Sequence, residues 1–103
     1  MTDRELLELA AKACGYTIRE NGTDVNGDAW YWCEQIADCW NPLNDDGDAL
    51  RMVVRLKLHV EPMETATWVS TPEFDVIEAY NDDPEAATRR ATVRAAAELG
   101  KVL

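Results

Sequence analysis

Polar and apolar positions in the first segment of the chain alternate with the period of a helix. From Leu6 onward, apolar residues recur every three or four positions, opposite a charged face. Thr2 and Glu5 have the three-residue spacing of a capping box, and Gly15 is typical of the position that follows a helix. The pattern therefore predicts a helix over residues 2–13.

The next segments are predicted to form a hairpin. Residues 16–20 and 29–33 are two runs rich in aromatic and β-branched side chains. The segment between them, 21–28, is rich in Asn, Gly and Asp, which favour turns. A turn-forming segment between two such runs is typical of a β-hairpin. Residues 34–38 are predicted to form a loop or one helical turn.

A second helix is predicted to follow a proline. Pro42 disfavours helical geometry at Asn41, so the helix has to start later. Either Asn44 or Asp45 can cap it, and acids in its first turn and bases in its last turn suit the helix dipole. We expect this helix to run to about Lys57.

Three short strands and a last helix complete the pattern. Apolar positions alternate in residues 58–62, 65–70 and 74–80, which predicts antiparallel strands. In the last of these runs apolar side chains occur on both sides, which favours a sheet covered on both faces by helices. The segment from Asp83 is alanine-rich and predicts a helix that ends at Gly100.

Length and composition favour one domain. A chain of 103 residues, of which 47% are hydrophobic, can form a single core, so we expect one α+β domain over residues 1–103. No apolar run approaches the roughly 20 residues that a membrane-spanning helix needs. The first residues lack the basic and apolar regions of a secretory signal, so we expect a cytoplasmic location.

The chain is strongly acidic, with a net charge of -10. This charge argues against nucleic acid as a partner, because nucleic-acid binding depends on clustered Lys and Arg. It favours a basic partner, or it simply keeps the protein soluble. Many of the acids fall in turns and at predicted helix starts, where capping alone explains them.

No pattern of catalytic or metal-ligating residues emerges. His59 is the only histidine, and the chain contains no familiar nucleophile, phosphate-binding or dinucleotide-binding motif. The three cysteines lack the spacing of a zinc site, and the acidic loop 44–48 does not follow the register of a calcium-binding loop. We therefore predict a protein that is not an enzyme and that uses no metal or cofactor.

Two groups of side chains are candidates for a binding surface. The aromatic group contributes large apolar area that either packs in the core or contacts a partner. The arginines of the last helix either pair with nearby acids or receive an anion or an acidic partner. The candidate residues are Trp30, Trp32, Trp40, Arg89, Arg90 and Arg94.

The second half of the chain resembles the phage ABA sandwich domain family of small phage and prophage proteins of unknown function. The resemblance rests on residues 40–42 (Trp-Asn-Pro), the acidic helix start at 45–50, and the closing helix at 87–97. It covers roughly residues 40–103, with the first helix as a weaker extension. It implies an α-β-α sandwich, with a small, mainly antiparallel sheet between helices, in a protein acting inside a bacterial cell.

These observations lead to a main functional hypothesis and two alternatives. The main one is a phage accessory protein without enzymatic activity that binds an unidentified host or phage protein through its acidic or aromatic surface. The first alternative is a small-molecule or nucleotide-binding protein that uses the aromatic group and the arginines of the last helix. The second is an acidic DNA mimic. Homo-oligomer formation also stays open.

Overall fold

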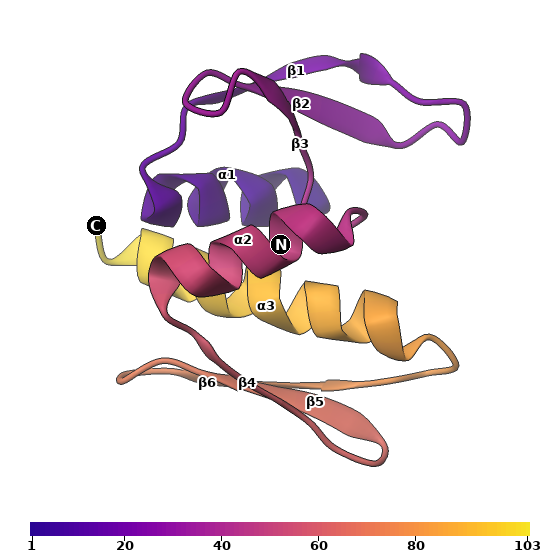
Figure 1. The fold of residues 1–103 in the computed structure, drawn as a ribbon, viewed down its shortest axis with the longest axis vertical. Helices are drawn as coiled ribbons and strands as arrows, with labels where there is room; N and C mark the ends of the chain where they lie inside the picture. The colour runs from indigo at the N-terminus through magenta and orange to yellow at the C-terminus, as the bar shows by residue number, and fades with distance from the viewer.

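Three helices lie in the middle of the molecule, and a small three-stranded sheet covers them on either side (Figure 1). The structure is a computed structural model that describes residues 1–103. In chain order the elements are α1 (Asp3–Cys14), β1 (Ile18–Thr23), β2 (Ala29–Cys33), β3 (Asp38–Trp40), α2 (Asp46–Leu56), β4 (His59–Pro62), β5 (Ala66–Ser70), β6 (Asp75–Ala79) and α3 (Pro84–Lys101).

Both sheets are antiparallel meanders. The first sheet has the order β1-β2-β3 and the second has the order β4-β5-β6. In the first sheet Tyr31 lies opposite Trp40, and both side chains are buried against the helices. In the second sheet Val60, Val69 and Val76 form a row across the three strands, on the face that meets α3. Each sheet therefore has one covered face, as its alternating pattern requires.

Local capping explains where the helices begin. Thr2 and Glu5 form the predicted capping box at the start of α1. The Asp45 side chain caps α2 by accepting a hydrogen bond from the Asp48 backbone N–H. The Asp83 side chain caps α3 by accepting a hydrogen bond from the Ala86 backbone N–H. The three predicted helix starts are confirmed to within a residue.

The alanine-rich helix α3 joins two hydrophobic cores. Ala96 and Ala97 pack in the larger core, together with side chains of α1, α2 and the first sheet. Ala91 and Ala95 pack in the smaller core, against the second sheet. Small side chains on both sides of one helix let its neighbours approach closely, so α3 can lie between two layers.

The α+β class and the small antiparallel sheets are confirmed, but the predicted layer order is not. The expectation was a single sheet between helices, whereas the helices lie between two sheets (Figure 1). Apolar residues on both sides of β6 suggested a doubly covered sheet, yet Ile77 is 62% exposed. Only one side of that strand meets α3, because Val76 alone is buried there.

Two local predictions also need correction. Asp38 falls in the segment predicted as a loop or one helical turn, but it begins the short strand β3, which pairs with β2. Gly100 was predicted to end the last helix but lies within α3. A Cβ atom at Gly100 would lie 2.0 Å from the Leu9 carbonyl oxygen of α1. This glycine is therefore explained by close helix packing and not by helix termination.

Candidate functional site

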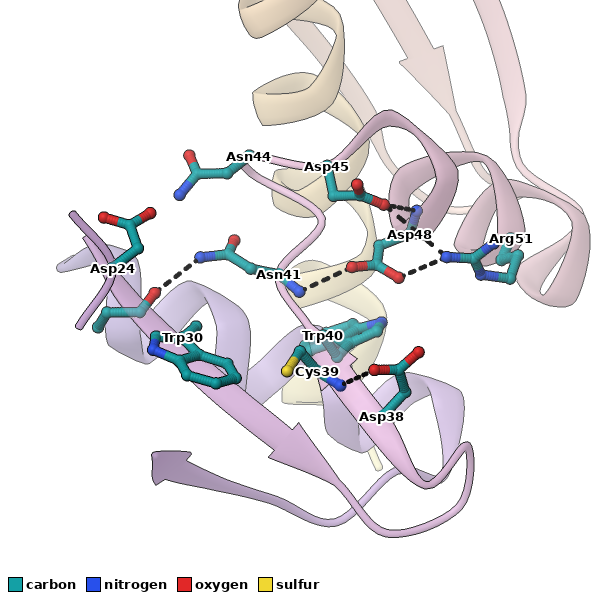
Figure 2. A pocket seen from close by; sticks show the side chains of 11 residues that line it. Asp24, Trp30, Asp38, Cys39, Trp40, Asn41, Asn44, Asp45, Asp48 and Arg51 are labelled. Atoms are coloured by element: carbon teal, nitrogen blue, oxygen red, sulfur yellow. Dashed lines mark hydrogen bonds and ion pairs between the residues drawn. The ribbon is translucent and has the colours of Figure 1, made fainter. Parts of the chain in front are cut away.

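A cleft of about 360 Å³ lies between the first sheet and the N-terminal half of α2 (Figure 2). We call it the acidic cleft because four carboxylates and one arginine supply its charged side chains. Its floor and walls come from the start of the β1–β2 turn, the start of β2, all of β3, the segment between β3 and α2, and the first turns of α2. The lining residues are Asp24, Ala29, Trp30, Asp38, Cys39, Trp40, Asn41, Asn44, Asp45, Asp48 and Arg51.

Trp30 and Trp40 give the acidic cleft its aromatic surface. Trp40 belongs to the larger core and is buried, with its ring edge-on to Tyr16 at 5.8 Å between centroids. Trp30 lies on the outer face of β2 and is only partly buried. The core tryptophan therefore fixes the floor, while Trp30 offers accessible aromatic surface to a ligand.

Three aspartates of the acidic cleft are oriented by the backbone. One oxygen of Asp24 accepts from the N–H groups of Asn26 and Asp28, at 2.8 and 3.0 Å. One oxygen of Asp38 accepts from the Cys39 N–H at 2.7 Å, and one of Asp45 accepts from the Asp48 N–H at 2.8 Å. In each aspartate the second oxygen has no hydrogen-bond partner within the chain, so it stays available.

The fourth carboxylate, Asp48, has a structural role. It is buried, and its two oxygens accept from the Asn41 backbone N–H at 3.0 Å and from the Arg51 guanidinium at 2.7 Å. The hydrogen bond to Asp48 is the main cause that raises the pKa of Arg51 above its ordinary value. Asn41 also donates from its amide to the Ala29 carbonyl. These contacts join β2, the segment after β3 and α2 at the cleft (Figure 2).

Arg51 does not neutralise the negative charge of the acidic cleft. Arg51 already pairs with Asp48 and lies 3.8 Å from a carboxylate oxygen of Asp45. Asp24 and Asp38 have no basic partner in the chain, since neither takes part in an ion pair. Carboxylates therefore outnumber bases four to one in the lining, which favours a cationic ligand.

The arginines predicted as a binding surface are held in separate ion pairs. Arg89 donates to the Leu43 carbonyl and to Asp46, both near the start of α2. Arg90 pairs with Asp3 at the start of α1, and Arg94 pairs with Glu78 of β6. None of the three lines the acidic cleft, so the structure does not bring the arginines together with the aromatic group.

The remaining candidate, Trp32, lies outside the acidic cleft. It is partly buried on the first sheet, where Arg19 and Cys39 are its neighbours across the strands. Trp30 and Trp40 stand out in the sequence as candidates, but the aspartates of the cleft do not, because a turn, a loop or a helix cap explains each of them locally. The only feature of the sequence that could have indicated the acidic cleft is that acidic residues lie on both sides of the aromatic segment 30–32.

The other side chains that could take part in chemistry, Cys14 and His59, lie away from the acidic cleft. Burial raises the pKa of the Cys14 thiol to about 11, against the opposing charge of Arg55, so this thiol is protonated at neutral pH. His59 lies on the second sheet, edge-on to Trp68. No three His, Cys, Asp or Glu side chains are grouped so that they could hold a metal ion. No helix has the length and apolarity needed to cross a bilayer.

Comparisons of the chain with family models, with curated proteins and with solved structures find no match. The resemblance of residues 40–103 to the phage ABA sandwich domain therefore stays a prediction. Two of its segments, 40–42 and 45–50, meet at the Asn41–Asp48 contact described above.

Proposed function

We propose that the protein is a binding module without enzymatic activity whose acidic cleft receives a basic segment of a partner protein. The proposal rests on three aspartates, each with one oxygen held by the backbone and one left free, in a cleft that Trp30 also lines. In the phage setting that the resemblance implies, the partner is a host or phage protein in the bacterial cytoplasm.

The chemistry of the acidic cleft suits a lysine or arginine side chain. The free oxygens of Asp24, Asp38 and Asp45 can accept charge-assisted hydrogen bonds from an ammonium or guanidinium group. The accessible surface of Trp30 can pack against the alkyl part of the same side chain or attract its charge. Because the carboxylates are already oriented, little side-chain freedom is lost when the cation binds.

Side chains of the partner, and not an added β-strand, are expected to supply the affinity. The β3 edge that faces the acidic cleft has its donors occupied, since Asp38 accepts from the Cys39 N–H and Asp48 accepts from the Asn41 N–H. An incoming strand would have to displace these carboxylates before it could pair with β3. Strand addition needs free backbone groups at a sheet edge.

The two alternatives receive less support. A nucleotide site built from the tryptophans and the arginines of α3 lacks the required proximity, because those arginines pair elsewhere. A DNA mimic needs carboxylates concentrated on one face. Here acids occur on all three helices and in both sheets.

The test is a titration of the protein with an octa-arginine peptide, using octa-glutamate as the negative probe. In the variant Asp24→Asn/Asp38→Asn/Asp45→Asn the amides can keep the backbone hydrogen bonds while the charges are lost. We expect this variant to bind octa-arginine at least about tenfold more weakly, and binding to the unmodified protein to weaken as salt is added.

A matched control separates local recognition from overall charge. Glu64→Gln/Glu73→Gln/Asp82→Asn removes the same number of charges from exposed side chains that make no hydrogen bond or ion pair. It should keep nearly full affinity. If both triple variants weakened binding equally, the overall charge of the protein alone would explain the binding, and the proposal would be overturned.

A further inference from the structure

Helix α2 exposes an apolar ridge to solvent. Leu50 and Val54 lie one helical turn apart on the same face, and their exposed fractions are 64% and 69%. The ridge borders a second cleft of about 300 Å³ between α2, β4 and α3, whose accessible lining is mainly apolar. Val53 of α2 and Val60 of β4 extend the apolar surface into that cleft. Contiguous apolar surface of this kind marks an interface.

The charges at the two ends of the apolar ridge are opposite in sign. Asp46 lies at the N-terminal end of α2, four positions before Leu50, and its side chain stays 77% exposed although it pairs with Arg89 of α3. Lys57 lies at the C-terminal end, three positions after Val54, and is exposed without an ion-pair partner. The two charges are thus nearly equidistant from the midpoint of the ridge. This distribution makes α2 complementary to a second α2 that runs in the opposite direction.

We propose that two copies of this chain form a symmetric dimer in which their α2 helices pack antiparallel across the apolar ridge. A twofold axis between Leu50 and Val54 places Leu50 of each copy near Val54 of the other. The same axis brings Asp46 beside Lys57 of the second copy, twice in each dimer. The dimer does not depend on the acidic cleft, so either proposal can fail without the other.

The first experiment is sedimentation of the protein over a range of concentrations. We expect a reversible dimer, and we expect Leu50→Glu/Val54→Glu to weaken it by about a hundredfold, because each change occurs twice in a symmetric interface. Ile77→Glu is the matched control, since Ile77 is similarly exposed but lies on the second sheet. It should leave the dimer intact. A protein that stays monomeric up to about 1 mM would overturn the proposal.

The second experiment tests the antiparallel arrangement itself. Asp46→Lys and Lys57→Glu each place like charges opposite one another in a homodimer, so each variant alone should be monomeric. When the two are mixed, both cross-pairs become attractive and a heterodimer should form. Circular dichroism establishes that each variant is folded. Two folded variants that fail to associate on mixing, or that dimerise separately as well as the unmodified protein does, would overturn the antiparallel pairing.

Discussion

Each free oxygen in the acidic cleft belongs to an aspartate that also has a structural contact. Asp24 closes the turn between β1 and β2, Asp38 accepts from the backbone of β3, and Asp45 caps α2. A carboxylate has two oxygens, so the oxygen used for structure fixes the direction of the other. Capping and binding are therefore compatible roles for the same residue. This arrangement explains how turn and cap residues can orient a binding surface.

At the same scale, Gly100 is expected to tolerate no side chain. A Cβ atom there would meet the Leu9 backbone of α1 at 2.0 Å, and neither backbone can move without disturbing the larger core. We expect Gly100→Ala to lower the free energy of unfolding by about 1–3 kcal/mol, the usual range for overpacking. Urea denaturation followed by circular dichroism measures this change.

Gly47→Ala is the control, because it makes the same chemical change in another helix. A Cβ atom at Gly47 would approach only the side chains of Arg51 and Asp45, at 3.2 Å. The higher helix propensity of alanine offsets these contacts, so the free energy of unfolding should change by less than about 1 kcal/mol. A Gly100→Ala variant as stable as the unmodified protein would contradict the close packing of α1 and α3.

At the scale of elements, α3 positions the other helices through its arginines. Arg89 reaches the middle of the segment between β3 and α2, and Arg90 reaches the start of α1. The two contacts differ in burial, since the side chain of Arg89 is 18% exposed and that of Arg90 is 38% exposed. The same residue type in the same helix is therefore expected to contribute unequally to stability.

We expect Arg89→Ala to destabilise the protein by about 1–2 kcal/mol, because it leaves the Leu43 carbonyl without its donor and removes the ion pair with Asp46. Arg90→Ala removes one exposed ion pair and should cost less than about 1 kcal/mol. Thermal unfolding of both variants gives the comparison. If the two losses were equal, Arg89 would not have the anchoring role described for it.

Local patterns predict the elements of this fold better than they predict its layers. The caps at Thr2, Asp45 and Asp83 depend on neighbours within three residues, so the sequence indicates them directly. The layer order depends on which face of α3 meets which sheet, and alanines on both sides of a helix do not specify that choice. The exposed Ile77 misleads in the same way, because an apolar residue at the surface resembles one that is covered.

The candidate site, like the fold, is predictable in its local features but not in its contacts between distant residues. Trp30 and Trp40 stand out from composition alone, and the structure places both at the acidic cleft. Asp38 could not be predicted there, because a strand of three residues carries too little pattern to be recognised. The arginines of α3 were plausible ligands for an anion until their partners were known, and those partners are distant in sequence.

At the scale of the whole molecule, function is expected to be confined to one side of the helical layer. The acidic cleft opens between the first sheet and α2, while the second sheet packs on α3 as a separate smaller core. A ligand of the acidic cleft should therefore leave the second sheet undisturbed. The residues that respond to a ligand therefore show which side of the helical layer binds it.

Binding of a basic segment at the acidic cleft can be located by a nuclear magnetic resonance titration of isotope-labelled protein with octa-arginine, observing backbone amides. If the acidic cleft binds the peptide, chemical-shift changes will concentrate in residues 24–30 and 38–51, which carry the cleft, and residues 59–79 of the second sheet will stay unchanged. Shifts spread evenly over the acidic surface, or centred on the second sheet, would contradict recognition of a basic segment by the acidic cleft.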